Sequence, residues 1–172
     1  MQSSTKRSTS IIAAEYLREL ESEVRATREC LEQVPMDQAD WKPHEKSMPL
    51  NYLAMMVAEI PKWITYTIEK SEIDFGTFEH AKISTTEELV AAFDQNMVNV
   101  RKAIKTLTDE GLKETFALKN KGELLFSSPK DESISQSINH LVHHRGQLTV
   151  YLKMLDKKIP SIYGPSADSG GF

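Results

Sequence analysis

Hydrophobic residues recur at helical spacing in four long stretches of this chain. The stretches cover residues 10–34, 47–70, 84–109 and 131–156. Intervals of three and four residues place the apolar side chains of each stretch on one face of a helix. Charged and polar residues fill the opposite faces. The pattern therefore predicts four amphipathic helices that pack around a shared core.

Helix-breaking and helix-capping residues indicate where the helices are expected to begin and end. Pro35 is expected to end the first helix, and Ser47 is expected to cap the second. Ser84 and Glu87 have the spacing of a capping box at the start of the third helix, and Gly111 is expected to end it. Within the second helix, Pro61 is expected to cause a bend because it cannot donate the usual backbone hydrogen bond.

Residues 112–130 form the least helical stretch. Turn-forming residues at 120–122 separate two short apolar runs, which leaves open either a short hairpin or an irregular loop. The C-terminal stretch 157–172 has two prolines and three glycines, so it is predicted to be non-helical, with its first half docked on the body. Residues 1–9 are polar and expected to be frayed. The predicted class is all-α: a single-domain four-helix bundle over residues 1–172, with a long connection between the third and fourth helices and an ordered tail.

Composition narrows the function classes. The 172 residues carry a formal net charge of −4 with a pI near 5.8, which argues against a general attraction to nucleic acid or anionic membranes. No apolar run is long enough for a transmembrane helix, and the N-terminus lacks the apolar segment of a signal peptide. Cys30 is the only cysteine and falls within the first predicted helix, where a packed, unreactive thiol is expected. These features predict a cytoplasmic protein.

The last predicted helix carries the candidate chemistry. His140 and His144 are four residues apart, so their side chains lie one turn apart on the same side and can reach one divalent metal ion. His143 is expected at the surface. Arg145 falls within the apolar stripe, so we expect it to be buried and paired with a carboxylate. Gln147 and Tyr151, on the same face as the histidine pair, either line a pocket or lie at a helix interface.

Three segments resemble a known family. They are the last-helix segment Asn139–Leu148, the second-helix segment Leu53–Pro61 and the tail segment Ile159–Asp168. Together they look like the DinB/YfiT-like proteins, metal-dependent four-helix bundles whose relatives include thiol S-transferases and suspected hydrolases. The resemblance covers most of the chain.

The resemblance implies a site for a divalent metal such as Zn²⁺, Ni²⁺ or Mn²⁺, held by three histidines. Two of them correspond to His140 and His144, whereas the third falls on Met56. A thioether is a soft, uncharged ligand that suits copper(I) better than these metals. Met56 is therefore expected to fill core space, with Glu59, one turn further on, as a possible substitute ligand.

Two functional hypotheses follow from the departure at Met56. The first is a metal-dependent transferase or hydrolase whose activity is weakened or lost. The second is a non-catalytic bundle that binds a small ligand in an inter-helix pocket or interacts with another protein. The histidine pair fits either an occupied metal site or a metal-free, hydrogen-bonded pair. The resemblance also implies a homodimer, whereas DNA binding is disfavoured by the acidic balance.

Overall fold

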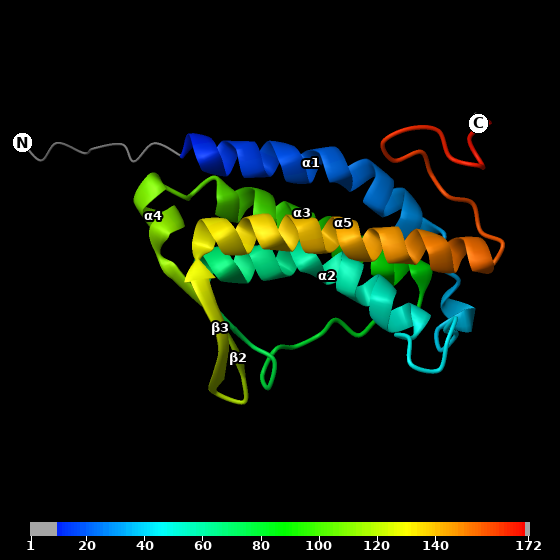
Figure 1. The fold of residues 1–172 in the computed structure, drawn as a ribbon, viewed down its shortest axis with the longest axis horizontal. Helices are drawn as coiled ribbons and strands as arrows, with labels where there is room; N and C mark the ends of the chain where they lie inside the picture. Colours follow the sequence, from blue (N-terminus) through cyan, green and yellow to red (C-terminus); the bar gives the residue numbers. More distant parts are fainter. Residues whose placement is uncertain (1–9, 171–172) are drawn as a thin grey trace, which may run out of the picture.

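Four long helices form the body of the protein in a computed structural model that describes residues 10–170. The expected frayed lead-in, residues 1–9, lies outside the described residues. The long helices run along the longest axis of the molecule (Figure 1). Their bounds are α1 (Ile11–Glu32), α2 (Leu50–Glu69), α3 (Thr86–Ile104) and α5 (Lys130–Met154). Each of the four predicted helical stretches thus contains a helix.

The helices share one apolar core. α2 packs against α3 and α5, and α1 packs against the same two helices. Each long helix contributes fully buried side chains, for example Leu20, Leu53, Phe93 and Leu148. No described helix combines the length and the apolar character that crossing a membrane requires.

The start of α1 follows the sequence prediction, but the start of α2 does not. The Ser10 hydroxyl accepts hydrogen bonds from the first turn of α1. The predicted cap at Ser47 is wrong, because Pro49 occupies the N-cap position of α2 and makes no side-chain capping bond. The preceding loop replaces that cap, since the backbone carbonyl of Trp41 accepts a hydrogen bond from Leu50 N at 2.9 Å. The loop also contains the 3₁₀ turn η1 (Met36–Gln38).

Both predicted ends of the third helix are also corrected. The capping box lies one residue later than expected, with Thr85 as N-cap and Glu88 as its partner. α3 ends at Ile104, and Gly111 lies inside a separate short helix, α4 (Asp109–Lys113). α4 has its own cap, because the Thr108 hydroxyl accepts from Gly111 N at 3.1 Å. The local cap at Thr108 starts a new helix before the glycine is reached.

A small sheet corrects the all-α prediction. Its strands are β1 (Glu72–Asp74), β2 (Thr115–Asn120) and β3 (Glu123–Pro129), in the order β1-β2-β3. β1 pairs with β2 in parallel, and β2 and β3 form an antiparallel hairpin. Of the two alternatives for residues 112–130, the hairpin is therefore confirmed. It leaves the ends of the long helices and projects away from them (Figure 1).

The Asp74 carboxylate fixes the hairpin turn to the loop that follows β1. It accepts hydrogen bonds from Gly76 N and Lys121 N at 2.8 Å and from Gly122 N at 2.7 Å. These bonds hold the pKa of Asp74 below its usual value. Lys121 and Gly122 both have positive φ, as a two-residue hairpin turn requires. One side chain thus connects two segments that are nearly 50 residues apart in sequence.

Candidate functional site

The histidine pair lies on α5 with the two rings in direct contact. The Nε2 atoms of His140 and His144 are 2.6 Å apart, and the ring centroids are 4.4 Å apart. His144 Nδ1 lies 2.7 Å from Gln147 Oε1. Since this amide oxygen can only accept, Nδ1 of His144 carries the proton, and its Nε2 accepts from His140 Nε2–H. The pair therefore forms a hydrogen-bonded chain that ends at Gln147.

Burial keeps both rings uncharged near neutral pH. Burial, followed by the neighbouring His144 and His143, lowers the pKa of His140 from 6.5 to about 4. Burial also lowers the pKa of His144, while its hydrogen bond to Gln147 acts in the opposite direction. Removing an imidazolium from water is unfavourable unless a partner compensates its charge. Among the described residues, no carboxylate pairs with either ring.

The donor set does not fit a three-ligand site for Zn²⁺, Ni²⁺ or Mn²⁺. Two imidazole nitrogens bound tetrahedrally at about 2.0–2.1 Å from one metal lie about 3.3 Å apart, so these rings would have to separate by about 0.7 Å. Met56 is half-buried on α2, the helix that packs against α5. Within residues 10–170, no cluster of three or more His, Cys, Asp or Glu residues is arranged to hold a metal ion.

Glu59, the possible substitute ligand, is already engaged elsewhere. Its side chain is 1% exposed, and Oε1 accepts from Ala81 N at 2.7 Å. Oε2 lies 2.6 Å from His80 Nδ1. Glu59 thus attaches the connection between β1 and α3 to α2. His80 itself is exposed, and the sequence pattern gave no sign of this contact.

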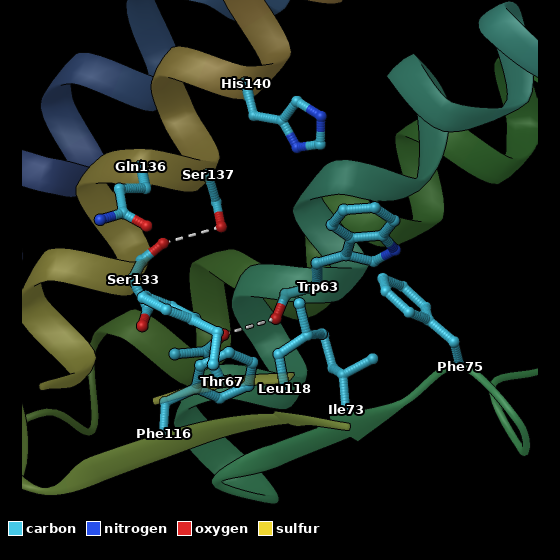
Figure 2. Close-up of a pocket in the computed structure, with 11 residues that line it drawn as sticks. Trp63, Thr67, Ile73, Phe75, Phe116, Leu118, Ser133, Gln136, Ser137 and His140 are labelled. Carbon is cyan, nitrogen blue, oxygen red and sulfur yellow. Dashed lines mark hydrogen bonds between the residues drawn. The ribbon is translucent and has the colours of Figure 1, made fainter. Parts of the chain in front are cut away.

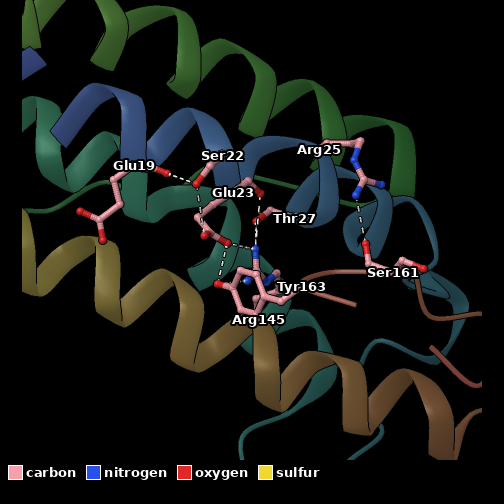
Figure 3. Close-up of polar contacts among 8 residues, drawn as sticks. All are labelled: Glu19, Ser22, Glu23, Arg25, Thr27, Arg145, Ser161 and Tyr163. Carbon is pink, nitrogen blue, oxygen red and sulfur yellow. Dashed lines mark hydrogen bonds and ion pairs between the residues drawn. The ribbon is translucent and has the colours of Figure 1, made fainter. Parts of the chain in front are cut away.

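Arg145 is the centre of a second polar cluster, shown in Figure 3. It is 1% exposed, and its Nη1 lies 2.5 Å from Glu23 Oε2, which confirms the predicted buried pairing. Arg145 Nη2 donates to the Tyr163 hydroxyl, and that hydroxyl donates to Glu23, both at 2.9 Å. Nη1 also contacts Thr27 Oγ1 at 3.2 Å. These contacts dock the first half of the tail on α1 and α5, as predicted.

An apolar pocket adjoins the histidine pair, between α2, α5 and the sheet (Figure 2). Its volume is about 340 Å³. Six of its lining residues are apolar, four of them aromatic: Trp63, Ile73, Phe75, Phe116, Leu118 and Phe126. The other five are polar: Thr67, Ser133, Gln136, Ser137 and His140. His140 therefore belongs both to the pair and to the pocket wall, where its ring lies 5.4 Å from the Trp63 ring, between centroids.

Gln147 and Tyr151, for which the sequence left open either a pocket wall or a helix interface, lie away from this pocket. Gln147 bonds to His144, and neither Gln147 nor Tyr151 lines this pocket. Tyr151 is buried against the loop between α1 and α2, where its ring packs edge-on against Trp41 at 5.5 Å and its hydroxyl donates to the Met48 carbonyl. Sequence reasoning missed the pocket because the hairpin supplies one of its walls. The alternation of Phe116 and Leu118 was the available signal.

Comparisons with known proteins agree with this architecture. The family model described as "DinB family" matches residues 1–170. The comparison with curated protein sequences gave no match. A DinB-like protein from Bacillus subtilis has a similar structure, with a TM-score of 0.67 and 17% identity over 88% of this chain and 99% of that one.

Two further solved structures are similar to the same degree. A DinB-like protein from Bacillus cereus superposes with a TM-score of 0.66 and 19% identity, over 90% of this chain and 99% of its own. A protein from Exiguobacterium sibiricum, described as a putative DinB family member, gives a TM-score of 0.66 and 18% identity, over 89% and 97% of the two chains. At these identities the structures establish the shared fold alone. With the family model matched over residues 1–170, the chain belongs to the DinB family.

Proposed function

We propose that this DinB-family protein has a weakened or lost divalent-metal site and serves as a small-molecule-binding four-helix bundle. One observation carries the proposal. His140 belongs to a histidine pair that lacks a third metal ligand among the described residues, and the same ring lines an apolar pocket. Methionine at position 56 removes the expected third imidazole, and both oxygens of Glu59 already have partners. The transferase or hydrolase chemistry that the resemblance implies needs a metal ion, which a weakened site would not hold firmly. The pocket beside the histidine pair does not depend on that ion.

The chemistry of the pair supports binding over catalysis. Three of the four ring nitrogens have hydrogen-bond partners without a metal, because the rings bond to each other and His144 bonds to Gln147. The volume of about 340 Å³ falls at the lower end of the range for small-molecule sites, roughly 300–1,000 Å³. Largely apolar walls with a few polar groups are typical of such sites.

The experiment is a calorimetric titration with toluene, a minimal apolar probe. Wild-type protein is expected to bind one toluene, because its transfer from water into an apolar cavity is favourable. Ser137→Phe would fill the pocket from α5 and abolish that binding. Ser135→Phe, two residues away and outside the pocket, is the matched control and should bind toluene as the wild type does. Absence of toluene binding to folded wild-type protein would refute the pocket as a ligand site.

The homodimer and the cytoplasmic location are proposals as well. For the homodimer, the support is an exposed apolar face near the end of α5, where Val150 and Met154 are 58% and 55% exposed and four residues apart. Light scattering of the purified protein should give the mass of a dimer. Val150→Lys should shift it toward the monomer, whereas Val98→Lys, an exposed valine on α3, should not.

A further inference from the structure

The walls of the pocket specify a ligand without formal charge. None of its eleven lining residues is Asp, Glu, Lys or Arg. An ionised ligand would lose its hydration there without gaining a counter-charge, which is strongly unfavourable. Four of the six apolar lining residues are aromatic. Aromatic rings pack favourably edge-to-face or offset against such walls, so a flat ring is the shape that the pocket fits best.

The polar groups of the pocket are biased toward accepting hydrogen bonds. The Ser137 hydroxyl donates its only proton to the Ser133 carbonyl at 2.8 Å, and the Thr67 hydroxyl donates to the Trp63 carbonyl at 3.0 Å. Both bonds are dashed in Figure 2. Each oxygen keeps lone pairs for a further bond, but neither has another proton to give.

The His140 ring also offers the pocket a hydrogen-bond acceptor. Its Nε2 faces His144 and donates to it, so Nδ1 is the nitrogen that remains for the pocket. In this tautomer Nδ1 is an acceptor, and within residues 10–170 it has no hydrogen-bond partner. Acceptors on α2 and α5 therefore outnumber donors. Among the lining side chains the donors are the amide of Gln136, a hydroxyl proton shared by Ser128 and Ser133, and the buried indole N–H of Trp63, which has no partner among the described residues.

We propose that the pocket binds an uncharged aromatic molecule of one or two rings that carries a hydrogen-bond donor, of the phenol or indole type. The ring lies between Trp63 and the aromatic side chains of the sheet. The hydroxyl or N–H of the ligand donates to Ser137 or Thr67 on the helical wall. This inference rests on the proposed function, because it names the ligand class of the same pocket.

The test compares three ligands that share a methylphenyl ring by calorimetry: p-cresol, toluene and 4-methylbenzoate. p-Cresol has the donor, toluene lacks it, and 4-methylbenzoate carries a negative charge. We expect p-cresol to bind about fivefold more tightly than toluene, the factor that one net hydrogen bond supplies. We expect 4-methylbenzoate to bind at least about 100-fold more weakly than p-cresol, because its carboxylate has no cationic partner in the pocket.

The combined variant Thr67→Val/Ser137→Ala removes both hydroxyl acceptors and keeps the apolar walls. Because His140 Nδ1 remains as an acceptor, the variant should lose most, though not all, of the fivefold preference for p-cresol, and toluene binding that is retained serves as an internal check of folding. Ser135→Ala, on the same helix but outside the pocket, should keep the fivefold preference.

Equal binding of p-cresol and toluene to the wild type, or an undiminished fivefold preference in the combined variant, would overturn the inference. Either result would leave the pocket itself as a ligand site. Failure of both ligands to bind folded protein would instead overturn the proposed function.

Discussion

The buried pair of Arg145 and Glu23 offers the sharpest stability prediction. Arg145 is 1% exposed and Glu23 is 6% exposed, so the substitution Arg145→Met leaves a carboxylate inside the protein without its cation. Breaking a buried ion pair in this way costs about 3–5 kcal/mol of unfolding free energy. Methionine retains most of the apolar contacts of the arginine stem, so the loss reports mainly on the unpaired charge.

The remaining contacts of Glu23 set the size of the effect. In Arg145→Met, Glu23 still accepts from the Tyr163 hydroxyl, which offsets part of the cost and favours the lower end of that range. Tyr163→Phe removes the two hydrogen bonds of this hydroxyl and keeps the ion pair, so a smaller loss of about 1–2 kcal/mol is expected. The double variant Glu23→Leu/Arg145→Met removes both charges and should recover much of the stability.

Urea denaturation followed by circular dichroism measures these differences. The matched control is Arg18→Met, which breaks an ion pair with Glu15 on the exposed side of α1. Surface pairs of this kind contribute less than about 1 kcal/mol. A loss below about 1 kcal/mol for Arg145→Met, or a double variant no more stable than the single one, would refute a buried and energetically coupled pair.

Three other predictions concern single groups. Burial raises the pKa of the Cys30 thiol to about 11, so a thiol reagent at pH 8 should meet roughly one thiolate in a thousand and react far faster after unfolding; rapid reaction of the native protein would contradict this. Asp74→Ala should speed hydrogen exchange of the Lys121 and Gly122 amides at least tenfold, measured by NMR, whereas unchanged exchange would show that the carboxylate does not hold the turn. Because the pKa of His140 is lowered to about 4, the unfolded chain binds more protons between pH 6.5 and 4, and stability falls as the pH drops through that interval. In His140→Gln this loss of stability should be smaller than in the wild type, by less than about 3 kcal/mol. An identical dependence of stability on pH in both proteins would exclude a buried neutral ring at position 140.

Local signals predicted the helical part of the fold. The helical spacing of apolar residues is a property of each segment alone, so all four long helices were located from sequence. The capping errors arose where a neighbouring group competes for the same backbone donors. At α2, the Trp41 carbonyl takes the place of a side-chain cap, and at α3 the residue after Ser84 makes the capping box.

The sheet and the pocket depend on contacts between distant segments. β1 has three residues, and its pairing with β2 joins positions such as Ile73 and Leu118 that are 45 residues apart. No local periodicity reports such a pairing. The pocket inherits this difficulty because its walls come from α2, α5 and the sheet together. The buried arginine was foreseen because its position on the helix is local, whereas Glu23 and Tyr163 were not, because they approach through tertiary packing.

The central claim is tested most directly by a zinc titration of untagged protein, comparing the wild type with Met56→His. If position 56 is the missing ligand, Met56→His should bind one Zn²⁺ at least tenfold more tightly than the wild type, and a further His140→Ala substitution should remove the gain. Met55→His, beside it on α2 and also half-buried, is the matched control and should not gain affinity. Wild-type protein that is purified with stoichiometric metal, and loses it in His140→Ala, would contradict the account.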